Sequence, residues 1–232
     1  MAKVSLIIGA GAGLSASLAR ALAKRGDKVV LAARDTTDLQ AFAAEINADL
    51  VNCDAKDRSD MEALFAHIDQ LDGALETAVF NPSARVRGPI DEVDPEAVER
   101  ALMVSAYGAF LMAHHASQRM LDAGQGTMLF TGASAGVKGF PKSASFAMGK
   151  FALRGLCQSL ARELHPKNIH IGHVVIDGGI ASTPQSGRSN AVDTPDTMLD
   201  PDAIAESYMH LLDQHRSAWS WEIELRPWVE KF

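Results

Sequence analysis

The chain has 232 residues, of which 47% are hydrophobic and 22% are charged, and its formal net charge is −7. This length is enough to bury one sizeable core, so we expect a single domain over residues 1–232. The acidic balance argues against nucleic acid as a partner, because nucleic-acid binding usually depends on a clustered basic surface.

Short apolar runs alternate with longer amphipathic segments along the chain. The runs predict strands at residues 4–8, 28–32, 50–53, 77–80, 127–130, 169–176 and 221–225. The segments between them predict helices at residues 14–24, 37–46, 59–69, 95–122, 146–165 and 202–215. Asp94 and Asp200 are the expected caps of two of these helices. The alternation predicts a Rossmann-like α/β fold, a doubly wound parallel sheet of about seven strands with helices on both faces.

One long irregular stretch, residues 178–199, is rich in Ser, Thr, Asn, Asp and Pro. It leaves the carboxyl end of a predicted strand, which is where ligands bind in doubly wound sheets, and loops of this length are more often functional than not. We expect a substrate lid at residues 178–199. A solvated connector is the alternative interpretation.

The start of the chain shows no basic leader, long apolar segment or small-residue cleavage site, so we expect a cytoplasmic protein with no membrane partner. Cys53 and Cys157 lie in apolar stretches without a Cys-x-x-Cys spacing, which favours reduced core residues over a disulfide or a reactive thiol. His170 and His173 are expected to be strand or core residues, because no carboxylate or nucleophile is paired with them in the sequence.

A glycine-rich turn follows the first predicted strand. It consists of Gly9, Ala10, Gly11, Ala12 and Gly13, and Leu14 begins the helix after it. Glycines let the backbone turn tightly and approach phosphates, and the helix amino terminus offers free N–H groups with a partial positive charge. The turn therefore predicts a pyrophosphate site, with a purely structural turn as the alternative.

The end of the second predicted strand decides which dinucleotide the site would prefer. An acidic side chain there would bind the adenine ribose of NAD and repel a 2′-phosphate. Ala33 fills this position and Arg34, whose guanidinium suits a phosphate, follows it. The pair predicts NADP(H) in preference to NAD(H). A solvated Arg34 is the alternative.

These features resemble the short-chain dehydrogenase/reductase family, and the resemblance covers nearly the whole chain. Gly9 and Gly13 match the first two glycines of the family's Gly-x-x-x-Gly-x-Gly loop, whereas Ser15 stands at the third and Ile8 replaces a common threonine.

The resemblance implies further cofactor contacts. Asp54, which precedes Ala55, matches the family's adenine-binding Asp. Asn81 matches the second Asn of the family's Asn-Asn-Ala-Gly motif, although its neighbours depart from that motif, so it either touches the cofactor or stabilises the sheet beside it. Gly178 and Ile180 lie near the family's Pro-Gly turn, which faces the nicotinamide carboxamide.

The segment 145–164 resembles the family's catalytic helix, and Lys150 matches its lysine. Phe146 occupies the usual Tyr position, Ala133 the usual Ser position and Ser105 the usual Asn position of the proton relay. The resemblance implies that Lys150 still holds the nicotinamide ribose, with a solvated lysine as the alternative. Because phenylalanine has no proton to give, the usual general acid is absent.

Two functions remain open at this point, since one fold hosts many functions. The first is an NADP(H)-dependent oxidoreductase with a non-standard active site and a small-molecule substrate. That substrate would be an activated alkene, a protonated imine, or a carbonyl that receives its proton from water, Ser134, Ser143 or Ser145. The second is a non-catalytic NADP(H)-binding sensor or assembly protein.

Basic residues on three predicted loops suggest an anionic substrate, with simple solvation as the alternative. These residues are Arg85, Arg87, Lys138, Lys142 and Arg188.

The helices predicted at 95–122 and 146–165 resemble those that pair subunits in the family, which implies a homodimer or homotetramer. The apolar residues available for such a contact are Met103, Tyr107, Phe110, Phe151 and Leu156.

Overall fold

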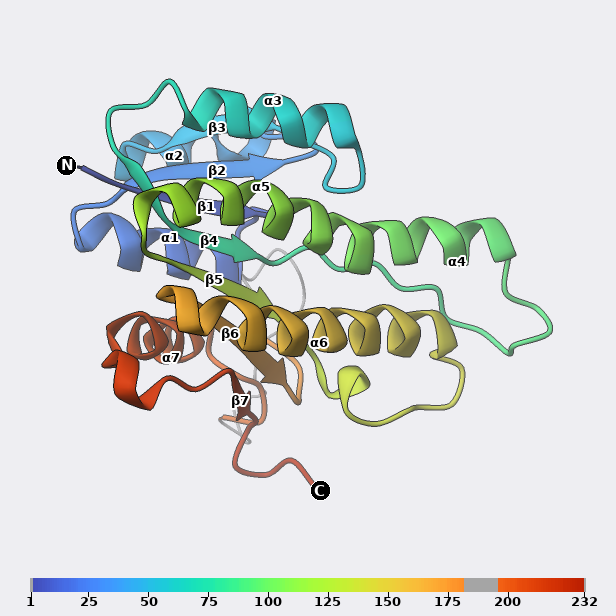
Figure 1. The fold of residues 1–232 in the computed structure, drawn as a ribbon. Coiled ribbons are helices and arrows are strands. Elements are labelled where there is room, and N and C mark those ends of the chain that lie inside the picture. Colours follow the sequence, from blue (N-terminus) through green and yellow to red (C-terminus); the bar gives the residue numbers. More distant parts are fainter. Residues whose placement is uncertain (1, 182–195, 232) are drawn as a thin grey trace.

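The computed structural model describes residues 2–181 and 196–231, and the described chain forms one parallel sheet in the order β3-β2-β1-β4-β5-β6-β7 (Figure 1). The strands are β1 Lys3–Ile8, β2 Lys28–Ala33, β3 Asp49–Asn52, β4 Ala74–Phe80, β5 Gly126–Thr131, β6 Ile169–Ile176 and β7 Glu222–Leu225. Because β1 pairs with β2 on one side and β4 on the other, the strand order reverses there. Ligands bind at the carboxyl side of such a reversal.

Helices cover both faces of the sheet (Figure 1), which confirms the predicted Rossmann-like fold. They are α1 Leu14–Lys24, α2 Gln40–Ile46, α3 Arg58–Ile68, α4 Pro95–Leu102, α5 Gly108–Ala123, α6 Ala144–Leu164 and α7 Pro201–Asp213. Leu6 and Ile8 of β1 belong to the core shared with α3, α5 and α6, whereas Ile7 belongs to the core shared with α1 and α7. Successive side chains of a strand point to opposite faces, so each strand contributes to both cores.

The helix boundaries follow the prediction with two local differences. The predicted helix 95–122 is divided by a π-helical turn, Met103–Tyr107, between α4 and α5, and the predicted helix 37–46 opens with a 3-10 turn, Thr37–Leu39. The predicted caps are confirmed: Asp94 accepts hydrogen bonds from the first-turn N–H groups of α4, and Asp200 does the same for α7.

Strand β6 is buried along its whole length and carries both strand histidines. His173 Nδ1 lies 2.9 Å from Glu222 Oε2, and Arg154 donates two hydrogen bonds to the same carboxylate. The burial confirms the prediction that both are strand residues of the core, and the fold adds a carboxylate partner for His173, because β7 brings Glu222 from 49 residues away. Burial lowers the pKa of His173 to about 4 even though Glu222 raises it, so the ring is neutral at pH 7.

Cys53 and Cys157 are both free and buried, as predicted, and burial raises the pKa of the Cys53 thiol to about 12. No helix within residues 2–181 and 196–231 is both long enough and apolar enough to cross a membrane.

Most of the expected lid at residues 178–199 lies outside the described residues, as does Arg188. Its two described ends are joined: Leu199 N donates to Gly179 O at 2.8 Å, and Ala181 N donates to Leu199 O at 2.8 Å. The segment therefore leaves and returns at one point beyond β6.

Candidate functional site

Two cavities open at the carboxyl end of the sheet, and Ser83 lines both of them. The smaller has a volume of about 470 Å³ and the larger about 1120 Å³. The first lies near the ends of β1, β2 and β3, and the second lies near the ends of β4, β5 and β6. Together they could hold one extended ligand or two ligands that meet.

The smaller cavity brings together four residues predicted to bind cofactor, namely Gly9, Arg34, Asp54 and Ala55. Arg34 is exposed at its wall. Asp35 also lines it, but its carboxylate accepts a hydrogen bond from Thr37 N at 2.9 Å, which turns it toward the 3-10 turn after β2. The cation therefore remains the group presented by the end of β2.

The glycine turn between β1 and α1 is shaped by close contact on one side and open space on the other. Gly9 has φ +82°, and a Cβ there would lie 2.7 Å from the Pro82 nitrogen. Only glycine satisfies both constraints. At Gly11 and Gly13 a Cβ would meet nothing within 4 Å, and α1 begins without a side-chain cap or an acidic residue in its first turn. This end of α1 therefore suits an anion.

The other predicted residues of the glycine turn lie at its tip and at the start of α1. Ala12 is exposed at the tip of the turn, while Leu14 is buried as the first residue of α1. Ser15, which the resemblance aligns with a third glycine, donates to Gly9 O at 2.9 Å. Asn81 Nδ2 donates in turn to Ser15 Oγ at 2.7 Å. Asn81 therefore braces the turn, although it also lines the larger cavity.

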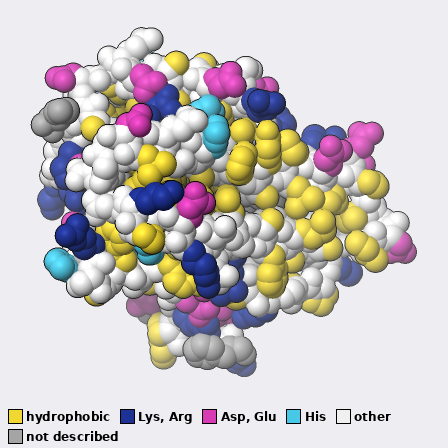
Figure 2. Space-filling view, in the orientation of Figure 1, with side chains coloured by type: hydrophobic (Ala, Val, Ile, Leu, Met, Phe, Trp, Pro, Cys, Tyr) yellow, Lys and Arg dark blue, Asp and Glu magenta, His cyan; other side chains and the backbone are white. Residues whose placement is uncertain are grey.

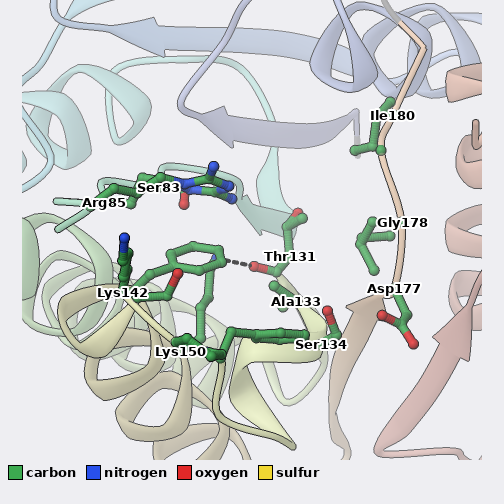
Figure 3. A pocket seen from close by; sticks show the side chains of 18 of the residues that line it. Ser83, Arg85, Thr131, Ala133, Ser134, Lys142, Lys150, Asp177, Gly178 and Ile180 are labelled. Atoms are coloured by element: carbon green, nitrogen blue, oxygen red, sulfur yellow. Dashed lines mark hydrogen bonds between the residues drawn. The ribbon is translucent and has the colours of Figure 1, made fainter. Parts of the chain in front are cut away.

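The larger cavity brings together most of the residues predicted for the proton relay and for the nicotinamide half of the cofactor. Its walls include Ala133, Phe146, Lys150, Gly178 and Ile180. Figure 3 shows Ala133 and Ser134 following Thr131 on one side of the cavity, with Gly178 and Ile180 across from them.

Lys150 is 2% exposed, and its ammonium donates to Thr131 O at 2.7 Å (Figure 3, dashed line). The pKa of Lys150 is lowered from 10.5 to about 8, mainly because the ammonium is buried; Cys157 raises the pKa and the nearby Arg85 charge lowers it. Thr131 is itself fixed, because its hydroxyl lies 2.8 Å from the buried Tyr208 hydroxyl. The lysine is thus held at a defined point of the cavity wall and is not a solvated helix residue.

Two serines predicted for other roles instead hold the loop after β4. Ser105 Oγ accepts from Ala84 N at 3.1 Å and donates to Ala84 O at 3.4 Å. Ser145 Oγ accepts from Val86 N at 2.9 Å and donates to Val86 O at 3.0 Å. Neither serine is part of the larger cavity's described lining, so Ser145, unlike Ser134 and Ser143, is not placed to supply a proton there.

Of the basic loop residues, Arg85, Arg87 and Lys142 line the larger cavity. Lys138 lies beside it and pairs with Asp177 at 3.3 Å. The basic residues of the loops after β4 and β5 therefore meet at this cavity.

Comparison with known proteins agrees with this geometry. The family model described as short chain dehydrogenase matches residues 3–192. The chain belongs to the short-chain dehydrogenase family. It is 32% identical, over 74% of its length and 70% of the relative's, to trans-4-hydroxycyclohexanecarboxylate dehydrogenase of Sinomonas cyclohexanicum. It is 25% identical, over 97% of both chains, to an uncharacterised oxidoreductase of Staphylococcus aureus strain USA300.

Among solved structures, a short-chain dehydrogenase from Rhodopseudomonas palustris superposes with a TM-score of 0.83 at 32% identity, covering 97% of this chain and 99% of that chain. The family relationship thus extends over the sheet, the glycine turn and both cavities.

Several residues of this short-chain dehydrogenase were not predicted from the sequence to belong to the site. Thr131 anchors Lys150, and Pro82 packs against Gly9. Thr131 directly follows one predicted strand and Pro82 lies two residues beyond another, both at the carboxyl edge of the sheet, and that position is the signal that could have identified them.

The buried Lys150 should make stability depend on pH in a defined window. The unfolded chain keeps the lysine protonated up to about pH 10.5, whereas the folded protein releases this proton near pH 8. Between these values the unfolded state binds more protons, so the free energy of unfolding rises with pH. Below pH 8 the folded state bears a buried ammonium, at a cost of about 3 kcal/mol.

We therefore expect Lys150→Met to raise the free energy of unfolding at pH 7 by roughly 1–2 kcal/mol, after allowing for the lost hydrogen bond to Thr131. This advantage should shrink as pH rises from 8 to 10.5, as measured by urea denaturation. Lys24→Met, at an exposed lysine of α1, is the control and should show no such trend. An advantage of Lys150→Met that does not vary with pH would contradict the assignment.

Proposed function

We propose that the protein is an NADP(H)-dependent oxidoreductase, built as a single NAD(P)-binding domain, that acts on a small molecule without a tyrosine acid. The observation that carries the proposal is that two neighbouring cavities share Ser83 in their walls. The smaller is lined by Arg34 and by Gly9 of the glycine turn, and the larger by Lys150. NADP(H), when bound, supplies or accepts a hydride.

The residues of the smaller cavity and the glycine turn fit a dinucleotide phosphate. The open space against Gly11 and Gly13 and the uncapped start of α1 suit a pyrophosphate. Arg34 suits a 2′-phosphate, because β2 itself carries no acidic side chain and the Asp35 carboxylate beside it accepts a hydrogen bond from Thr37 N. Asp54 and Ala55 would flank the adenine side, as the family resemblance implies.

At the larger cavity, Lys150 would hold the nicotinamide ribose, and Gly178 and Ile180 would lie on the carboxamide side. The family's proton relay has no equivalent here. Phe146 and Ala133 carry no hydroxyl, and both hydrogen-bonding directions of the Ser105 hydroxyl are used by Ala84. We propose that the substrate needs no phenolic acid, or takes its proton from water, Ser134 or Ser143.

The relatives described above are named as a dehydrogenase and an oxidoreductase, which favours catalysis over a non-catalytic NADP(H)-binding role. The Sinomonas relative is named for a hydroxycyclohexanecarboxylate. We propose an anionic substrate for this chain too, because the described wall of the larger cavity includes Arg85, Arg87 and Lys142.

The cofactor preference can be tested by titration. Unmodified protein should bind NADPH more tightly than NADH, as followed by fluorescence. Arg34→Ala should weaken NADPH by about 2 kcal/mol, the value of a charged hydrogen bond, and leave NADH nearly unchanged. Arg58→Ala, at an exposed arginine that starts α3, is the matched control. Equal affinities of the unmodified protein for the two cofactors would refute the assignment.

The missing relay can be tested by restoring it. With NADPH and 4-oxocyclohexanecarboxylate, unmodified protein should turn over very slowly by absorbance at the nicotinamide band. Phe146→Tyr combined with Ala133→Ser should raise kcat roughly a hundredfold or more, the usual contribution of positioned acid catalysis. Phe146→Leu with Ala133→Ser is the control without a phenol. Fast ketone reduction by the unmodified protein, with one essential acid in its pH profile, would show that the acid is not missing.

We also propose that the protein forms a homodimer or homotetramer through α4, α5 and α6. Phe110 of α5 and Met148 and Phe151 of α6 are 47%, 52% and 45% exposed, and Figure 2 shows apolar side chains gathered over these helices. Burying such a surface would drive association. Light scattering should give a multiple of the 24.8 kDa chain mass.

Phe110→Glu with Phe151→Glu should shift the mass to that of a monomer, whereas Trp228→Glu, at an exposed aromatic near the carboxyl end, should not. A monomer mass for the unmodified protein across micromolar concentrations would refute this interface.

A further inference from the structure

Arg85 is the one residue of the loop after β4 that lies between two doubly hydrogen-bonded neighbours. Ser105 binds both the N–H and the C=O of Ala84, and Ser145 binds both the N–H and the C=O of Val86. The backbone on either side of Arg85 is therefore fixed to α6 and to the π-helical turn before α5. The fixed backbone therefore restricts the conformations open to the Arg85 side chain.

The Arg85 guanidinium is positioned a second time by an aromatic ring. Its Cζ lies 3.9 Å from the centroid of the Phe146 ring, close enough for a cation–π interaction. Phe146 is 8% exposed and lines the larger cavity, so the guanidinium covers part of that wall (Figure 3). When a guanidinium stacks on a ring, its N–H groups point outward in the plane of the guanidinium, which is the direction from which a ligand can accept hydrogen bonds.

The charges around this point favour an anion. Arg87, Lys142 and Lys150 share the cavity lining with Arg85. The acidic residues of that lining are Asp177 and Glu230. The Asp177 carboxylate is engaged by Lys138 at 3.3 Å and by Arg226 at 3.4 Å, so its charge is largely compensated.

We infer that Arg85 is the specificity-determining residue of the larger cavity and binds a carboxylate group of the substrate through its planar fork. The inference rests on the proposed function in so far as the bound anion is the substrate of the reaction. The existence of an anion site at Arg85 does not depend on it. A guanidinium binds a carboxylate with two parallel hydrogen bonds and cannot give up a proton near neutral pH. Arg85 therefore binds and orients, and it does not act as the acid. Because the stack and the serines already restrict it, binding costs little side-chain entropy.

Calorimetric titration with two unreactive probes of nearly the same shape, benzoate and benzamide, tests this site. Each probe is added to the full chain with and without saturating NADPH. Benzoate should bind at least about tenfold more tightly than benzamide, since hydrogen bonds to charged groups contribute more than neutral ones. Arg85→Gln should abolish this preference. Arg85→Lys should lose most of it, because an ammonium keeps the charge without the planar fork.

Arg58→Gln, at the exposed arginine that begins α3 and lines neither cavity, is the control and should keep the preference. Arg87→Gln, at an arginine of the same loop and cavity, should lose less of the preference than Arg85→Gln. Thermal unfolding of each variant checks that it is folded. Equal binding of the probes to unmodified protein, a preference that survives Arg85→Gln, or one that Arg87→Gln removes equally would overturn the inference. NADPH titration of the same samples is read separately: failure to bind NADPH would refute the proposed function, whereas benzoate selectivity reports on Arg85 alone.

Discussion

The site depends on how the segment from Asn81 to Val86 is fixed after β4. Asn81 N donates to Ile8 O at 3.0 Å, and its side chain braces Ser15 in the glycine turn. Pro82 packs against Gly9 so closely that no side chain fits there. Ser105 and Ser145 then bind the next residues of the segment. Because this segment lines both cavities, the loop after β4 sets the position of the glycine turn relative to the wall of the larger cavity.

Two residues that the family resemblance aligns with relay positions have other contacts in the structure. Ser105 and Phe146, aligned with the family's Asn and Tyr, both contact the loop that carries Arg85. Ser105 binds the backbone before Arg85, and Phe146 supplies the ring beneath its guanidinium. Returning either position alone to the family residue would alter this arrangement without rebuilding a relay, since Ala133 would still lack a hydroxyl. The positions are therefore coupled, and they are best understood as one changed wall of the cavity.

The sequence predicted the fold, the helix caps and the residues of the glycine turn because their signals are local. Apolar periodicity, an Asp before a helix, and glycines directly after a strand all act within a few residues. It could not predict the roles of Ser145 or Glu222. Ser145 bonds a residue 59 positions away, and Glu222 reaches His173 across 49 positions. Such pairings follow from sheet order and loop paths, which periodicity does not specify. The cofactor assignment of Arg34 remains a prediction, because its placement at the cavity does not itself establish a ligand.

The burial of Lys150 bears on the function of the larger cavity. A buried ammonium costs stability, and an apolar side chain of similar length would pack at this position without that cost. An ammonium has three donors, and among the described residues Thr131 O is the acceptor that the structure provides. A ligand with neighbouring hydroxyl groups, such as a ribose, could satisfy the others from the cavity side. If the protein binds such a ligand, as proposed, binding would recover the free energy that burial of the ammonium costs, which would account for a lysine at this position.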